Sequence, residues 1–122
     1  MSDSDSWCIL TTRLGKDVRE PTDADLKDAL VEVLSTADVE HPNAWLSLGL
    51  GDGTMYVLDV CGAGTIMFNQ WADADFEEEL APPTKLADVS IEDAQRLWRS
   101  LLRRDVEAVR CEAWQPVMSD AK

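Results

Sequence analysis

Residues 44–71, AWLSLGLGDGTMYVLDVCGAGTIMFNQW, contain three apolar runs separated by two glycine-containing segments. The runs at 44–50, 54–60 and 65–71 combine β-branched, aromatic and leucine residues, and the glycines between them are typical of turns, so we expect a meander of three antiparallel strands. The first two runs are apolar at most successive positions. Because alternate side chains of a strand lie on opposite faces, this composition predicts a central place in a sheet that is covered on both sides.

Two amphipathic helices are predicted, one before and one after this meander. The first begins after Thr22, which has Asp25 three residues later, and the second begins after Ser90, which has Asp93 at the same spacing. Apolar residues then repeat at the i, i+3, i+4 spacing of a helix that packs on one face. The two stripes are Leu26, Ala29, Leu30, Val33 and Leu34, and Ile91, Ala94, Leu97, Trp98, Leu101 and Leu102.

The other segments predict two strands and a long loop. Trp7–Leu14 is β-branched and aromatic, which indicates a strand, and the partly alternating segment Val106–Trp114 is expected to be an edge strand. Residues 72–89 are expected to form a loop, because five acids in seven residues precede Pro82 and Pro83, and proline excludes helix there.

The expected fold class is α+β, in the order β-α-β-β-β-loop-α-β. It has one antiparallel or mixed sheet of about five strands with two helices packed on it. Residues 7–118 are predicted to form one domain, and the polar segments 1–6 and 119–122 are expected to be disordered tails.

The acidic residues are concentrated in the middle of the chain, which has a net charge of −13. Between Lys27 and Lys85 there is no Lys or Arg, and this span holds eleven acidic residues. Neutralising phosphates requires clustered basic residues, so direct nucleic-acid binding is not expected. A basic partner protein fits this charge better, although acidic surfaces also serve solubility alone.

The sequence does not indicate a metal, a cofactor or a membrane segment. Cys8, Cys61 and Cys111 are odd in number and widely separated, which favours reduced thiols, and none has the local spacing of a zinc ligand pair. The stretch that begins at Asp73 lacks the glycine and the final glutamate of a calcium loop. No long apolar run or signal segment is present, so we expect a cytoplasmic protein without a membrane anchor.

The candidate partner-binding residues centre on the segment 71–79, which mixes aromatic residues with carboxylates. Aromatic rings supply buried area in protein interfaces, and carboxylates steer a basic partner and select it. The alternative is that Trp71 and Phe76 point into the core while the acids form a solvated rim. With two shorter acidic segments included, the candidate set is Trp71, Asp73, Asp75, Phe76, Glu77, Glu78, Glu79, Asp52, Asp38 and Glu40.

The chain resembles the immunity proteins of bacterial polymorphic toxin systems, in particular immunity protein family one. The resemblance rests on the early amphipathic helix, on the strands AWLSLGL and TMYVLDV around GDG, and on the block VSIEDAQRLWRSLLRRDVEAVRCEAW, with Ser90, Ala94 and Trp114 at the family's positions. RRDVEAVR stands where the family often has a Gly and a Pro. The resemblance implies a protein without catalytic residues that binds a cognate toxin, such as a nuclease or a nucleic-acid deaminase, and blocks its basic active site. A monomer in a 1:1 complex is expected.

Two other functions remain open from the sequence. The first is an acidic nucleic-acid mimic or adaptor that occupies a basic groove on a host protein, which shares the charge argument. The second is a small thiol-dependent enzyme in which Cys61, or another cysteine, pairs with His41. His41 is the only histidine and precedes a proline, which places it in an extended or turn segment.

Overall fold

The three apolar runs form the centre of an antiparallel sheet. The computed structural model describes residues 6–35, 43–51, 53–61, 64–72, 79–112 and 114–116. Within these ranges the chain forms a seven-stranded sheet, ordered β2-β1-β3-β4-β5-β6-β7, and three helices. The elements are β1 (Trp7–Thr11), β2 (Asp17–Arg19), α1 (Asp23–Ser35), β3 (Asn43–Gly49), β4 (Met55–Cys61), β5 (Thr65–Trp71), β6 (Glu79–Leu86), α2 (Ile91–Leu102), α3 (Val106–Arg110) and β7 (Gln115–Pro116). The predicted α+β class is confirmed, with more strands and one more helix than expected.

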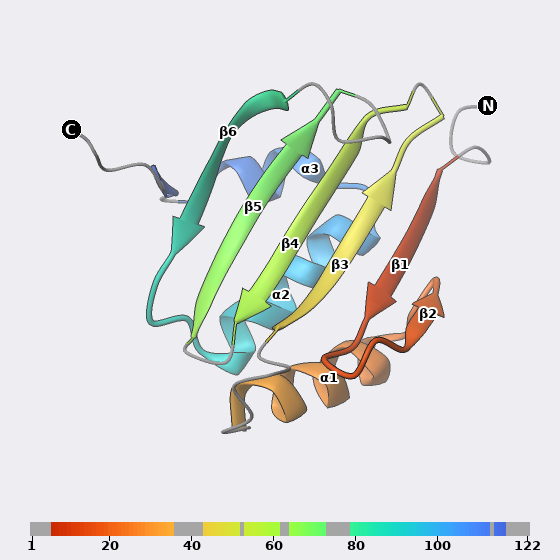
Figure 1. The fold of residues 1–122 in the computed structure, drawn as a ribbon, viewed down its shortest axis with the longest axis vertical. Helices are drawn as coiled ribbons and strands as arrows, with labels where there is room; N and C mark the ends of the chain where they lie inside the picture. Colours follow the sequence, from red (N-terminus) through yellow and green to blue (C-terminus); the bar gives the residue numbers. More distant parts are fainter. Residues whose placement is uncertain are drawn as a thin grey trace.

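All three helices lie on one face of the sheet. Figure 1 shows α2 and α3 behind the middle strands and α1 near β1 and β2. Alternate side chains of the four central strands are buried against these helices. They are Cys8, Leu10, Ala44, Leu46, Leu48, Tyr56, Leu58, Val60, Ile66 and Phe68.

The predicted helical stripes form the other half of this core. Leu26, Ala29, Leu30 and Val33 of α1 and Ala94, Leu97, Trp98 and Leu101 of α2 are buried. Trp98 is fully buried, and its indole Nε1 donates a hydrogen bond to the Leu58 carbonyl of β4 at 3.1 Å. This bond satisfies the one polar group that the largest core side chain takes out of water.

The predicted helix starts are confirmed by their caps. Thr22 Oγ1 accepts the Asp25 N–H at 3.2 Å, and the Asp25 carboxylate accepts the Thr22 N–H at 2.9 Å, which is a reciprocal capping box. Ser90 Oγ accepts the Asp93 N–H at 3.1 Å. These bonds satisfy amide donors that the first turn of a helix leaves without intrahelical partners.

The strand expected at Trp7–Leu14 is shorter than predicted and is followed by an additional strand. It ends at Thr11, because Gly15 at φ +86 allows residues 12–16 to turn, with the Gly15 N–H donating to the Thr12 carbonyl at 2.9 Å. The chain then returns as β2, which pairs with β1 in antiparallel register.

The loop expected at 72–89 contains β6, so that prediction is wrong for residues 79–86. β6 pairs with β5 through Phe68 opposite Thr84 and Gln70 opposite Ala81, with a register shift between the two pairs. Pro82 and Pro83 therefore both fall opposite Asn69. A bulge of this kind tolerates proline, because the residues in it do not take part in the regular ladder.

The edge strand expected at Val106–Trp114 is also wrong. Residues 106–110 form α3, which Asp105 caps by accepting the Ala108 N–H at 3.2 Å. Arg104, at φ +64, separates α3 from α2. Among the residues described after this helix, only the two-residue strand β7 pairs with β6. Trp114 packs on Phe68 with ring centroids 5.2 Å apart.

Ion pairs of two arginines join the second helix region to the N-terminal part of the chain. Arg99 donates two hydrogen bonds to Asp23, at 2.8 and 2.9 Å, and this bonding lowers the pKa of Asp23. Arg104 contacts Glu20 at 3.2 Å, and the Glu20 carboxylate also accepts the Cys8 N–H at 2.8 Å. Arg104 also donates to the Ser6 hydroxyl at 3.0 Å. The remaining residues assigned to the two tails lie outside the described ranges.

Candidate partner-binding surface

The sheet face opposite the helices is covered by no helix among the described residues. This overturns the expectation of a sheet covered on both sides: the alternate side chains that face the helices are buried, whereas most of those on the other face of β1, β3, β4 and β5 are half-buried, with Met55 a buried exception. We call this surface the open face. It carries Trp7, Ile9, Trp45, Ser47, Val57, Asp59, Met67, Asn69 and Trp71.

Three of the five tryptophans lie on the open face, in β1, β3 and β5. Trp7, Trp45 and Trp71 are each half-buried, whereas Trp98 is fully buried. The Trp7 indole lies against Gly49, where a Cβ atom would overlap the ring. Half-buried tryptophans on a helix-free sheet face are the type of residue that supplies binding energy in protein interfaces.

A pocket of about 360 Å³ lies between two of these tryptophans. It is lined by Trp45, Ser47, Val57, Asp59, Asn69 and Trp71, which come from β3, β4 and β5. Trp45 is the register partner of Asp59, and Trp71 is the register partner of Met55, two positions before Val57. The indole rings therefore come from diagonal positions on either side of Val57.

Asp59 is the only charged residue in β1, β3, β4 and β5. One of its carboxylate oxygens, Oδ1, accepts a hydrogen bond from Asn43 Nδ2 at 2.9 Å. Burial raises the pKa of Asp59, and the hydrogen bond from Asn43 opposes that shift. The structure therefore holds a carboxylate in an environment that disfavours its charge.

The described residues place no basic group in contact with Asp59. Lys85 of β6 is opposite Met67, which in turn is opposite Asp59, so Lys85 stands two strands away, about 10 Å between strand axes. Arg19 lies on β2, the edge strand on the other side of β4. The centre of the open face is thus apolar and aromatic around a single negative charge.

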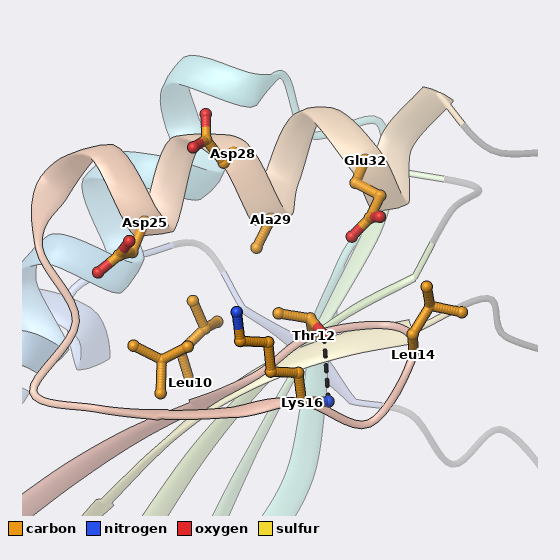
Figure 2. A pocket seen from close by; sticks show the side chains of 9 residues that line it. Leu10, Thr12, Leu14, Lys16, Asp25, Asp28, Ala29 and Glu32 are labelled. Carbon is orange, nitrogen blue, oxygen red and sulfur yellow. Dashed lines mark hydrogen bonds between the residues drawn. The ribbon is translucent and has the colours of Figure 1, made fainter.

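A second depression, of about 550 Å³, lies between α1 and the β1–β2 hairpin (Figure 2). Its lining is Leu10, Thr12, Leu14, Lys16, Val18, Asp25, Asp28, Ala29 and Glu32. Figure 2 shows the Lys16 side chain pointing from the hairpin toward the helix. This groove already contains a cation of the chain itself, and Asp25 is used in the α1 cap. The open-face pocket is therefore the stronger candidate for binding.

The cysteines differ in their surroundings. Burial raises the pKa of the Cys8 thiol to about 12, although the nearby Arg104 lowers it. Cys8 is therefore a poor nucleophile, because the reactive thiolate is disfavoured. Cys61 is half-buried and Cys111 is exposed. His41 lies outside the described residues, so its pairing with a thiol stays a prediction.

In the part of the chain that the structure describes, no group of three or more His, Cys, Asp or Glu side chains is placed to hold a metal ion. No helix in the same part is long and apolar enough to cross a bilayer.

Most of the predicted site residues fall outside the described ranges. Trp71 is the last residue of β5 and lines the open-face pocket, and Glu79 is its register partner at the start of β6. The structure therefore brings these two ends of the predicted segment together. The predicted residues outside the described ranges are Asp73, Asp75, Phe76, Glu77, Glu78, Asp52, Asp38 and Glu40.

The other residues of the pocket were not predicted from the sequence. Trp45 and Asp59 were assigned to a covered sheet, which hides the fact that they lie on the same face. The charged residue Asp59 inside the apolar run 54–60 was the available signal, because an unpaired carboxylate is not expected in a strand buried on both sides.

Comparison with protein-family models, with curated proteins and with solved structures gives no match to this chain.

Proposed function

We propose that the protein binds a basic partner protein through the open face and acts as an immunity protein. In this role it neutralises a cognate bacterial toxin, a nuclease or nucleic-acid deaminase, in the cytoplasm by blocking the toxin's basic active site. The observation that carries the proposal is the placement of Trp7, Trp45 and Trp71 with Asp59 on a sheet face without a described helix. The resemblance of the sequence motifs to immunity proteins is independent support for the toxin.

The charge of the chain supports the choice of a basic partner. A net charge of −13 attracts cationic proteins over distances comparable to the Debye length, about 8–10 Å at physiological salt. A toxin that acts on nucleic acid needs a positive cleft to bind phosphates. Long-range attraction speeds the encounter, and the tryptophans then supply the buried area that slows dissociation.

The test is to co-express the protein with the toxin-like product of a neighbouring gene and to measure complex formation at low and high salt. We expect a 1:1 complex, loss of toxicity and weaker association at high salt. If no complex forms at low salt and toxicity is unchanged, the proposal is wrong.

A pair of variants then tests the surface. Trp45→Ala removes an open-face ring that is not part of the core, and we expect at least a 30-fold weaker affinity, the loss that about 2 kcal/mol at an interface hot spot produces. Leu14→Ala is the matched control, because Leu14 is 61% exposed and lies in the α1 groove. Equal affinities of the two variants would remove the open face from the proposal.

A second candidate function rests on α1. Asp25, Asp28 and Glu32 line the groove of Figure 2 and form a row along the helix, with neighbouring Cβ atoms about 5–6 Å apart. A regularly spaced row of carboxylates favours an acidic nucleic-acid mimic or adaptor. For this function, Asp28→Asn with Glu32→Gln should abolish partner binding while Trp45→Ala leaves it unchanged, the reverse of the result expected for the open face.

A further inference from the structure

We propose that the pocket between Trp45 and Trp71 receives an arginine side chain of the partner, with the guanidinium on the Asp59 carboxylate. This assignment rests on the proposed function for the partner, but the pocket's preference for a guanidinium is a property of this chain alone. The partner must therefore supply an arginine at the centre of its interface.

The Asp59 carboxylate has no cation beside it among the described residues. A carboxylate that is partly removed from water is normally paired with a cation, because desolvation penalises the charged form. Asn43 supplies one neutral hydrogen bond, to Oδ1. No hydrogen bond or ion pair to Oδ2 is formed by the residues the structure describes. Lys85 lies two strands away on β6, and Arg19 lies on the edge strand β2. A cation from outside would complete the site.

The pocket walls offer the groups that a guanidinium binds. Indole rings attract cations over their faces, and a planar guanidinium stacks on them while its N–H groups bond a carboxylate. Trp45 and Trp71 supply two such rings in one pocket with Asp59. Ser47 and Asn69, which also line the pocket, offer oxygen acceptors for the remaining N–H groups. Lysine, a compact point charge, uses fewer of these features.

The pocket is small enough to suit a single side chain. The pocket volume of about 360 Å³ is at the lower end of the range of ligand pockets, roughly 300–1,000 Å³, which suits one inserted side chain better than a large ligand. Its neighbours on the open face, Trp7 and Ile9 of β1 and Met67 of β5, would then contact the surrounding surface of the partner. A charged side chain in a desolvated pocket surrounded by apolar contacts is the usual arrangement of an interface hot spot.

The experiment needs no partner protein. The indole N–H signals of Trp45 and Trp71 are followed by NMR while N-acetyl-L-arginine amide is added, with N-acetyl-L-citrulline amide as the uncharged analogue of the same shape. We expect saturable shifts of both signals with arginine, with a dissociation constant on the order of millimolar for so small a ligand, and no saturable shift with citrulline. Shifts with the citrulline compound equal to those with the arginine compound would overturn the assignment. So would equal shifts with N-acetyl-L-lysine amide.

A matched pair of variants locates the charge that binds the probe. Asp59→Asn keeps the shape of the pocket and should weaken arginine binding at least tenfold, whereas Asp28→Asn, in the α1 groove, should leave it unchanged. Unchanged binding in Asp59→Asn would overturn the proposal. If the toxin-like partner binds but the arginine probe does not, the arginine site is wrong and the proposed function is unaffected. If the arginine probe binds but the partner does not, the arginine site is supported and the proposed function is wrong.

Discussion

Substitutions of Trp98 and Trp45 test whether only one face of the sheet belongs to the hydrophobic core. Trp98 is fully buried beneath the helices and donates to the Leu58 carbonyl at 3.1 Å, whereas Trp45 is half-buried on the open face. Replacing each of them by phenylalanine removes the same atoms in two different environments. We expect a large loss of stability in Trp98→Phe and a small one in Trp45→Phe.

The magnitude for Trp98→Phe follows from three contributions. The lost indole hydrogen bond costs about 1 kcal/mol. The missing atoms leave a cavity of roughly 40 Å³, which at about 24 cal/mol per Å³ costs about 1 kcal/mol. Their lost burial costs about 1 kcal/mol more at about 25 cal/mol per Å². The sum is about 3 kcal/mol, a fall in Tm of about 10–12 °C for a domain of this size, whereas Trp45→Phe should cost below about 1 kcal/mol.

The assay is urea unfolding followed by far-UV circular dichroism, which does not depend on the tryptophan signal that the substitutions remove. Equal m-values for the two variants would show that the unfolding reaction itself is unchanged. If Trp45→Phe destabilises the protein as much as Trp98→Phe, the face that carries Trp45 is part of the core, and the account of an open face is refuted.

Three further outcomes are expected. Burial raises the pKa of Asp59 in the folded protein, so the ionised carboxylate destabilises the fold. Asp59→Asn should therefore be more stable than the wild type near neutral pH. This difference in the free energy of unfolding should vanish as the pH falls below about 3.9, the pKa of an unfolded aspartate. A difference in urea stability that is independent of pH would contradict this. Gly49→Ala forces a Cβ atom into the Trp7 indole and should lower the free energy of unfolding by about 1–3 kcal/mol in the same assay. The double variant with Trp7→Ala should recover part of this stability. If the losses of the two single variants simply add, the contact is not the cause. A thiol reagent should modify the exposed Cys111 quickly in the folded protein. Cys8, whose pKa is raised to about 12, should react only when the protein unfolds. Mass spectrometry of the peptides can measure both rates.

The parts of the fold that local sequence determines were predictable. The starts of α1 and α2 depend on Thr22 and Ser90, each of which bonds an amide three residues later, and their buried stripes follow from helical spacing alone. The meander was predictable for the same reason, because its glycines and apolar runs lie next to one another in the chain. These elements require no knowledge of distant residues.

The elements that were missed depend on partners or on backbone conformations that the sequence does not reveal locally. β6 exists because β5 offers it an edge and because a bulge opposite Asn69 accommodates Pro82 and Pro83. α3 exists because Arg104 adopts a left-handed conformation and Asp105 then caps a new helix, whereas alternation alone indicated a strand. In both cases tertiary context decided between alternatives that the local sequence left open.

The candidate site was predictable only in part, for a related reason. Trp71 was identified from its place beside a run of acids, but Trp45 and Asp59 come from other strands, and only the register between β3, β4 and β5 brings them to the same pocket. Which face of a sheet remains open depends on where the helices pack. The sequence showed two apolar faces, and the structure shows that helices cover one of them.

Contact between the partner and the open face can be read most directly from the NMR spectrum of the five indole N–H groups with and without the toxin-like partner. We expect the signals of Trp7, Trp45 and Trp71 to shift on binding and the signal of Trp98, in the core, to stay unchanged. Binding that leaves all three open-face signals unchanged would contradict it.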